Sequence, residues 1–318
     1  MILDAHVHLV ALGPDSGGFL SPKMRSGVVF RILKRMIGIK GNDGAQLDLD
    51  FQKVLIKWSD ESTVDALGLL AFDGVYDAKG KLDKKKTHLY VPNDYAFKVA
   101  SLSDSLLPIA SINPQREDAL DELDRVSDLG ATAIKTLPNS MNFDPANLAY
   151  KLFWQKMADL KLPLLTHTSF EHTIPSYNQI YGKPERLKLA LENGVVVIAA
   201  HCASSGVAHL KEDMPTWLSM LESFPNLYGD ISAMASLSRF PYIHKVLASE
   251  LAMERVIFGS DFPVPVSPIV FTRKLGLAKV RELAKIKNPI EKNYQTFKAV
   301  GVTQEIMERS AKILRLEK

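Results

Sequence analysis

The run Val195-Val-Val-Ile-Ala-Ala-His201 (VVVIAAH) indicates what kind of fold this chain adopts. Apolar residues occupy both faces of this run, which is typical of a strand in a parallel sheet covered by helices. The stretch before it, Pro184–Glu192, begins with proline and is followed by Asn193 and Gly194, as expected for a short helix. The sequence therefore predicts a helix and then a buried parallel strand with a histidine at its carboxyl end.

The same unit recurs along the chain at intervals of about thirty residues. Together with the earlier apolar runs, it predicts the strands Leu3–His8, Val64–Phe72, Leu106–Asn113, Ala131–Thr136, Leu162–His167, Val195–His201, Leu227–Asp230 and Val256–Asp261. This order favours an α/β fold, a (β/α)₈ TIM barrel forming a single domain over residues 1–318. An open doubly wound sheet is the alternative, but its glycine-rich loop after the first strand is absent. Extra helices follow the last strand, around Pro268–Lys285, Pro289–Ala299 and Thr303–Leu316.

The segment 11–62 between the first two strands is longer than a simple βα connection needs. Within it, Pro22–Ile37 mixes basic and apolar residues in the manner of an amphipathic helix. A basic amphipathic helix can contact a membrane surface. We favour a cap that packs over the mouth of the barrel, because long connections in this fold commonly cover the site. The segment is therefore predicted to be an inserted cap.

The composition excludes several classes of protein. A net charge of +3 over 318 residues offers no concentrated basic face for a nucleic acid. The single cysteine, Cys202, precludes an internal disulfide and fits a reducing compartment. The first predicted strand begins so early that a cleaved leader is not expected, and no apolar run is long enough to cross a membrane. We expect a cytoplasmic protein that acts on a small molecule; it could form a homo-oligomer, although nothing in the sequence fixes its oligomeric state.

Polar residues at the ends of the predicted strands indicate a metal site. His6 and His8 are two residues apart, so on a strand their side chains share one face with Asp4. In a barrel the carboxyl ends of all strands meet at one mouth. The residues gathered there would be His6, His8, Lys135, His167, His201 and Asp261. This donor set suits a divalent ion, with Zn²⁺ the leading choice, and Asp261 is placed to accept a proton from water.

Simpler interpretations remain open for single members of this set. A histidine that ends a strand, such as His201, is often satisfied by a backbone hydrogen bond. Asp230, which is outside the set, is best explained as a strand-end aspartate that caps a helix, or else as a support for a neighbouring residue. His172, in the loop after His167, is as consistent with a surface position as with a substrate contact. Cys202 is best explained as a small buried side chain.

The chain resembles the amidohydrolase superfamily, specifically its amidohydrolase-2 branch of metal-dependent TIM-barrel hydrolases and decarboxylases. The motifs that carry the resemblance are Asp4-Ala-His6-Val-His8, Ser111-Ile-Asn-Pro114, Ala133-Ile-Lys135, Leu165-Thr-His167, Ala200-His201, Tyr228-Gly-Asp-Ile-Ser232 and Gly259-Ser-Asp261-Phe-Pro263. They run in order from residue 2 to about residue 265, whereas segment 10–63 matches nothing in the pattern.

The resemblance implies a metal set of His6, His8, His167 and Asp261, with Asp261 also accepting a proton. It leaves the role of His201 open, since the strand-six histidine polarises substrate or water in single-metal relatives and is a ligand in two-metal relatives. Lys135 decides between these cases. A carbamate on this lysine would bridge two metal ions, whereas an unmodified lysine would contact substrate or form an ion pair.

The leading hypothesis for the reaction is metal-dependent hydrolysis of an ester, lactone or amide bond in a small, anionic substrate. Asp261 would accept the proton of the attacking water, and His201 would stabilise charge on the substrate oxygen. Lys135, Lys183 and Arg239 are candidates for binding the anionic group. The resemblance equally permits a decarboxylase of unsaturated or aromatic acids. A binding protein without catalysis would have lost some of these ligands, and all are present.

Overall fold

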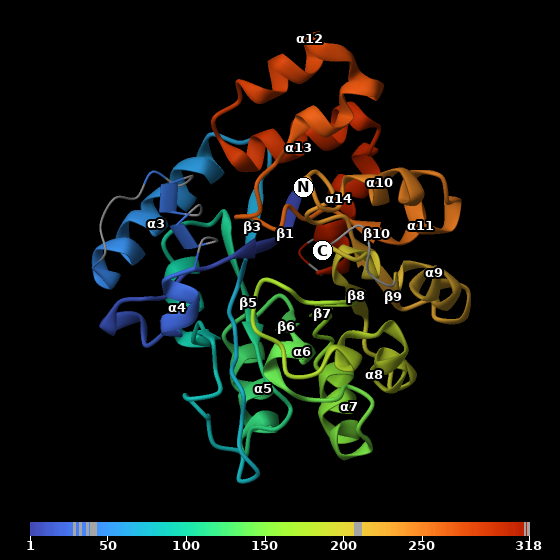
Figure 1. Ribbon diagram of the computed structural model, residues 1–318. Coiled ribbons are helices and arrows are strands. Elements are labelled where there is room, and N and C mark those ends of the chain that lie inside the picture. The colour runs from blue at the N-terminus through green and yellow to red at the C-terminus, as the bar shows by residue number, and fades with distance from the viewer. Residues whose placement is uncertain are drawn as a thin grey trace.

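The computed structural model describes residues 1–27, 30, 31, 34, 35, 38, 43–206, 212–314 and 316. Within this part of the chain, parallel strands follow one another around a barrel in sequence order (Figure 1). The eight-stranded sheet consists of β1 (Leu3–His8), β3 (Ala66–Leu70), β5 (Leu106–Ser111), β6 (Ile134–Thr136), β7 (Leu164–Thr166), β8 (Val197–Ala199), β9 (Leu227–Asp230) and β10 (Val256–Ile257). The predicted α/β barrel is confirmed.

Backbone hydrogen bonds close the barrel between its first and last strands. The amide of Ala5 donates to the carbonyl of Phe258 over 3.2 Å, and the amide of His8 donates to Phe262 over 2.8 Å. In the reverse direction, the Asp261 amide donates to the carbonyl of His6 over 2.9 Å. The chain beyond Val256–Ile257 therefore continues alongside β1 and brings Asp261 next to the two histidines of the first strand.

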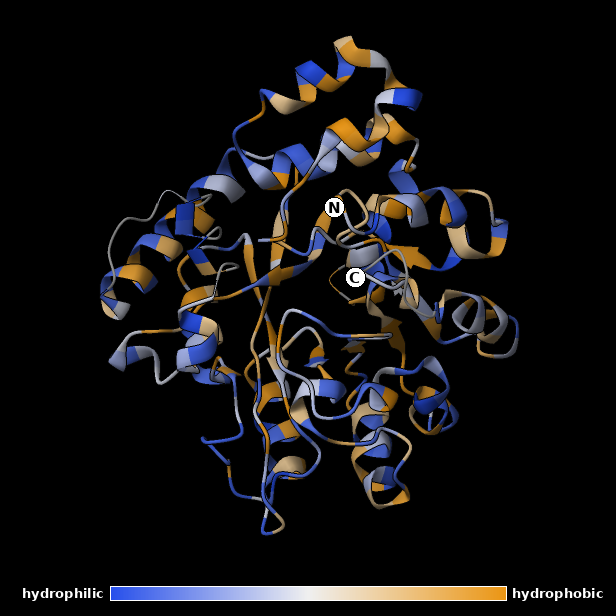
Figure 2. Cartoon of the chain, viewed as in Figure 1, coloured by the Kyte–Doolittle hydropathy of each residue, from blue (hydrophilic) through white to orange (hydrophobic). Residues whose placement is uncertain are grey.

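Helices surround the strands (Figure 1). They are α1 (Pro22–Arg25), α3 (Gly44–Asp60), α4 (Asn93–Ala100), α5 (Ala119–Asp128), α6 (Pro138–Met141), α7 (Lys151–Asp159), α8 (Lys188–Glu192), α9 (Met214–Ser223), α10 (Phe240–Leu247), α11 (Glu250–Arg255), α12 (Thr272–Ala284), α13 (Pro289–Val300) and α14 (Gln304–Ile313). The central strands are largely apolar and the helices carry both polar and apolar faces (Figure 2). No helix in the described ranges is long and apolar enough to cross a membrane.

Two packed layers form the core. Side chains inside the barrel, among them Leu165, Ile198 and Ile257, form one buried cluster, and α14 adds Ala311 and Leu314 to it. The larger cluster lies between the strands and the surrounding helices. Helix α14 is one of the predicted C-terminal helices, and it contacts β1 and β10. It therefore packs against the strands where the barrel closes.

The segment predicted as an inserted cap contains a regular barrel helix. Helix α3 buries Leu47, Phe51 and Leu55 at helical spacing, and the ring of Phe51 stacks on Phe262 at 6.1 Å. It therefore takes the place of the helix that belongs to the first βα unit. Of the predicted helix Pro22–Ile37, the structure shows α1 over Pro22–Arg25, and most of its apolar residues lie outside the described residues. A short antiparallel ladder, β2 (Phe19–Leu20) with β4 (Leu89–Tyr90), ties this segment to the loop after β3.

The strands end earlier than the apolar runs predict. Strand β8 stops at Ala199 because His201, Cys202 and Ala203 adopt left-handed backbone angles, with φ of 57°, 49° and 53°. Strand β10 stops at Ile257, and Asp261 has φ of 62°. A left-handed residue cannot continue an extended ladder, so the chain turns where the polar residues begin.

Candidate metal centre

Strand β1 presents two histidines at the mouth of the barrel. Its pairing with β3 shifts register between Asp4 and Val7, an irregularity that re-aims the end of the strand. The rings of His6 and His8 lie 5.2 Å apart. His6 is fully buried, whereas the His8 side chain is 28% exposed. The pair therefore joins the interior of the barrel to its solvent-facing rim.

Asp261 completes a three-residue group that could hold a metal ion. Its Oδ1 lies 3.0 Å from His8 Nε2 and 3.3 Å from His6 Nε2. In the described part of the chain, one ligand atom from each of the three residues lies within 4.8 Å of the others. Two imidazole nitrogens and a carboxylate oxygen are a donor set that Zn²⁺ accepts, with room for further ligands. The residues present therefore fit a divalent ion.

The charge of the Asp261 carboxylate is favoured by its neighbours. Burial alone would raise its pKa, but His6, His8 and Lys135 outweigh that effect and hold the pKa below its usual value. Burial and Lys135 in turn lower the pKa of His6. The carboxylate is thus ionised and His6 is neutral near pH 7, which are the protonation states that metal ligands need.

Lys135 points its amine at the same centre. The residue is buried at the end of β6, and its Nζ lies 3.2 Å from His6 Nε2. Burial lowers the pKa of Lys135 to about 8, although Asp230, Asp261 and Glu171 act in the opposite direction. The amine is therefore within reach of the group formed by His6, His8 and Asp261.

His201 lies near the carboxylate oxygen of Asp261 that His8 does not contact. Its Nε2 is 4.0 Å from Asp261 Oδ2, and its ring is 5.5 Å from that of His6. Its Nδ1 lies 2.7 Å from the hydroxyl of Ser232 and 3.1 Å from the Ser232 carbonyl. Burial holds the pKa of His201 well below its usual value, so this imidazole is neutral.

His167 is adjacent to this centre but turned towards another acid. Its ring lies 5.4 Å from that of His201. Its Nε2 lies 3.5 Å from Glu171 Oε2 and 3.4 Å from the carbonyl of Phe170. Burial lowers the pKa of His167 to about 4. The structure therefore gathers the six predicted residues at one mouth, with His167 outside the three-residue group.

Two residues at the mouth were not predicted from the sequence. Glu171 is held by the amides of Thr173 and Ile174, the latter over 2.8 Å, and faces His167. Ser232 contacts His201, as described above. Both follow a strand-end polar residue by a few positions, Glu171 after His167 and Ser232 after Asp230. For Glu171 that spacing was the only available signal, because loop residues have no periodic pattern. Ser232 also ends the motif Tyr228-Gly-Asp-Ile-Ser232, to which no role was assigned.

The remaining candidates have different surroundings. Arg239 is 7% exposed and donates to the carbonyl and hydroxyl of Ser204, the latter over 3.1 Å. Its positive charge is favoured by three carboxylates of the mouth, those of Asp261, Glu171 and Asp230. The guanidinium therefore lies among these acids. His172 is exposed and stacks on Phe170. Cys202 is buried, with a raised pKa caused by burial, as the structural interpretation predicted.

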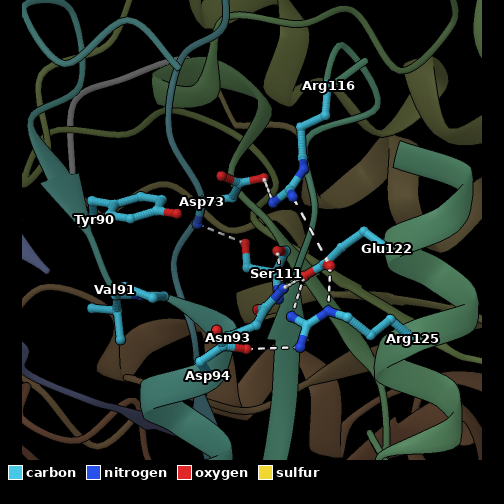
Figure 3. Close-up of a pocket in the computed structure, with 10 residues that line it drawn as sticks. Asp73, Tyr90, Val91, Asn93, Asp94, Ser111, Arg116, Glu122 and Arg125 are labelled. Atoms are coloured by element: carbon cyan, nitrogen blue, oxygen red, sulfur yellow. Dashed lines mark hydrogen bonds and ion pairs between the residues drawn. The ribbon is translucent and has the colours of Figure 1, made fainter. Parts of the chain in front are cut away.

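A cavity of about 360 Å³ lies apart from the histidines. Figure 3 shows Arg116 from the loop before α5 and Arg125 from α5 on its lining, with Glu122 of α5 between them and Asp73 beside Arg116. Arg125 pairs with Glu122 at 2.7 Å, and Arg116 lies 3.7 Å from Asp73. Its lining includes none of the six predicted site residues. The positive charges of the two arginines and the negative charges of the two acids in this cavity largely neutralise one another.

Comparisons with known proteins agree with this geometry. The family model described as Amidohydrolase matches residues 4–292. An uncharacterised TIM-barrel protein from Bordetella bronchiseptica superimposes with a TM-score of 0.66 at 14% identity, covering 99% of this chain and 98% of that one. A probable 2-pyrone-4,6-dicarboxylic acid hydrolase from Acinetobacter baumannii gives 0.58 at 12% identity, covering 99% of each chain.

A decarboxylase also shares the fold. The 2,6-dihydroxybenzoate decarboxylase from Rhizobium gives a TM-score of 0.57 at 14% identity and covers 100% of this chain and 98% of that one. No curated protein sequence matches. At these identities the structural similarity establishes the barrel, whereas the family match rests on the sequence itself.

Proposed function

From the premise that this chain belongs to the amidohydrolase family, as its motifs predicted, we propose that it is a metal-dependent hydrolase. Its substrate would be a small anionic molecule with an ester, lactone or amide bond. The observation that carries the proposal is the convergence of His6, His8 and Asp261 within 4.8 Å at a partly exposed edge of the mouth. The similar fold of a probable dicarboxylic acid hydrolase supports it.

The bound metal would be held by His6, His8 and Asp261, with Zn²⁺ the leading choice, and would polarise a carbonyl and lower the pKa of water towards about 7. His167 and His201 are the further candidates for ligands. A carbamate on Lys135 would supply oxygen ligands for a second ion, and the amine that would carry it lies 3.2 Å from His6 Nε2.

The residues of the chain supply a route for the proton. Asp261 Oδ2 and His201 Nε2 lie 4.0 Å apart, beyond direct hydrogen-bond distance, so a proton accepted by the carboxylate would reach the imidazole through one intervening water or through the substrate. His201 presents an unprotonated Nε2, as its contacts with Ser232 require. It therefore accepts a proton before it can stabilise negative charge, and we assign the initial stabilisation of that charge to the amine of Lys135 in the form without a carbamate.

Decarboxylation of an aromatic or unsaturated acid is the second candidate function. The 2,6-dihydroxybenzoate decarboxylase from Rhizobium matches the whole of this chain in fold. A single ion held by His6, His8 and Asp261 would need no modified lysine, which suits this reaction as well. In that case Arg239 and an unmodified Lys135 would bind the carboxylate of the substrate.

Elemental analysis of the purified protein, prepared with bicarbonate and divalent metal, tests the metal centre. The wild type should carry one or two ions, and a fall from two to one or none in Lys135→Ala would establish the bridge. His244→Gln is the matched control, since His244 is exposed on α10. A wild type without metal would contradict the proposal.

Assays of both reactions separate the two functions. The metal-loaded protein should release acid from esters or lactones of dicarboxylic acids, and His8→Ala should lower that rate by at least about a hundredfold. Release of CO₂ from aromatic acids, with no hydrolysis across the same panel, would replace the hydrolase by the decarboxylase.

A further inference from the structure

Asp230 joins three strands of the barrel beneath the candidate metal centre. The residue is fully buried at the end of β9. Its Oδ2 lies 2.8 Å from His6 Nδ1 on β1. Its Oδ1 accepts from the backbone amide of His201 over 2.7 Å, from the amide of Ser232 over 3.1 Å, and from the Ser232 hydroxyl. Every one of these partners donates, because an ionised carboxylate can only accept.

The contacts of His201 fix which of its nitrogens carries the proton. The carbonyl of Ser232, 3.1 Å from His201 Nδ1, can only accept a hydrogen bond. The Ser232 hydroxyl, 2.7 Å from the same nitrogen, already donates its single proton to Asp230, so it must accept as well. Both contacts therefore require a proton on Nδ1. In the neutral ring Nε2 is then unprotonated, and it faces Asp261.

The contact of His6 fixes its proton in the same way. Asp230 Oδ2 accepts from Nδ1, which leaves Nε2 as the unprotonated nitrogen. That nitrogen lies 3.2 Å from the Lys135 amine and 3.3 Å from Asp261 Oδ1. The two histidines thus present the same kind of atom to the mouth, although they come from strands far apart in the sequence.

We propose that Asp230 is a positioning residue that sets the tautomer of His6, whereas the Ser232 carbonyl sets that of His201. This inference rests on the proposed function in one respect: it takes the Nε2 atoms to be the ones that face metal or substrate. A neutral imidazole with its proton on Nε2 could neither bind a metal nor accept a proton there. The same carboxylate also accepts the backbone amide of His201, so it holds both residues in place.

The substitution Asp230→Asn should affect the two histidines differently. Three donors surround the position of Oδ1, so the amide oxygen will face His201 and Ser232. The amide nitrogen then faces His6 Nδ1 and donates to it. His6 must shift its proton to Nε2, whereas His201 keeps its proton on Nδ1 because the Ser232 carbonyl still accepts from it.

Nuclear magnetic resonance of the metal-free protein labelled with ¹⁵N-histidine tests this directly. Long-range proton–nitrogen correlations identify the protonated nitrogen of each ring, and His6→Gln and His201→Gln assign the two signals. We expect Nδ1–H in both residues of the wild type, and a shift to Nε2–H for His6 alone in Asp230→Asn. Ser232→Ala should leave both tautomers unchanged, because Asp230 and the Ser232 carbonyl keep their partners.

Asp73→Asn is the matched control. Asp73 is also buried and accepts backbone amides, from Asn113 over 2.7 Å and Gly74 over 2.8 Å, but it lies in the separate cavity. Its substitution should leave both tautomers as in the wild type. Zinc binding measured by calorimetry should weaken by about 10-fold to 100-fold in Asp230→Asn, as for loss of other outer-shell partners, and stay unchanged in Asp73→Asn.

The outcomes separate this inference from the proposed function. Nε2–H on either histidine of the wild type, or an unchanged His6 tautomer in a folded Asp230→Asn, would overturn the positioning role. If Asp230→Asn does not fold, the wild-type tautomers alone decide. A wild type with the expected tautomers that binds no metal and hydrolyses nothing would contradict the proposed function and leave the positioning role of Asp230 supported.

Discussion

Residues at the mouth lie where the backbone leaves the regular ladder. His201 and Asp261, with φ of 57° and 62°, adopt left-handed backbone angles, which every residue except glycine disfavours. Ala233, after β9, has φ of 58°. Such strain persists only where surrounding contacts determine the conformation, and here the amide of Asp261 bonds to His6 while the amide of His201 bonds to Asp230. The geometry of the site is thus built into the strand ends.

The sequence predicted the site residues that end strands and missed those that follow them. His167 and His201 could be found because a polar residue at the end of an apolar run repeats with the βα unit. Glu171 and Ser232 could not, since their positions depend on loop conformations that no periodicity encodes. Asp230 was predicted as a structural residue or a support for a neighbour, and its side chain bonds to the His6 ring and to the backbone amide of His201.

Arg239 provides a prediction at this scale. Its buried guanidinium is the cation placed among the acids of the mouth, so it should bind an anionic group of the substrate. We expect Arg239→Gln to weaken binding of small dicarboxylates to the metal-loaded protein by about 10-fold to 100-fold, because a charge-assisted bond is lost. Calorimetry with phthalate measures this.

The control for Arg239 is Arg125→Gln, which removes a cation on α5 that pairs with Glu122. Its dicarboxylate affinity should match that of the wild type. Equal weakening in both variants would show that overall charge, rather than Arg239, attracts the anion.

At the level of elements, the helices after β10 and the helix after β1 hold one wall of the barrel together. Phe262, next to Asp261, packs against Phe51 and Trp58 of α3. The sequence contained the apolar spacing of α3, with Leu47, Phe51 and Leu55 four residues apart. It was missed because the whole segment was interpreted as an insertion, so a helix with ordinary packing was assigned to a cap.

Asn288 tests how these helices are joined. Its Oδ1 accepts from the amide of Ile290 over 3.0 Å at the start of α13, and its Nδ2 donates to the Trp58 carbonyl over 2.8 Å. Asn288→Ala loses both functions, so we expect the free energy of unfolding to fall by about 2 kcal/mol. Denaturant unfolding followed by circular dichroism measures this change.

Asn288→Asp distinguishes the two contributions. An aspartate keeps the cap but cannot donate to the Trp58 carbonyl, so its loss of stability should lie between those of the wild type and the alanine variant. Thr303→Ala, which removes the cap of α14 alone, should cost about 1 kcal/mol. A cost for Asn288→Ala no greater than that for Thr303→Ala would indicate that the bond to α3 contributes nothing.

For the molecule as a whole, the candidate metal centre spans the closure of the barrel. His6 and His8 belong to the first strand and Asp261 to the chain after the last one, and three backbone bonds join the two. Asp4 adds a further link, since its Oδ1 accepts from the amides of His6 and Ser260 over 3.1 and 2.8 Å. A metal ion bound there would connect the two ends of the sheet.

This placement predicts that divalent metal stabilises the whole fold. An ion that binds only the native state stabilises it by about 2.7 kcal/mol at a hundred times its Kd, so the thermal unfolding midpoint should rise as Zn²⁺ is added. His8→Ala should lose most of that rise, because it removes one of the three candidate ligands, and the rise is measured from its own metal-free midpoint, which the lost bond to Asp261 should lower. His244→Gln should respond to Zn²⁺ as the wild type does. A rise of equal size in His8→Ala would mean that the ion binds elsewhere, and closure of the barrel would then depend on its backbone bonds and Asp4 alone.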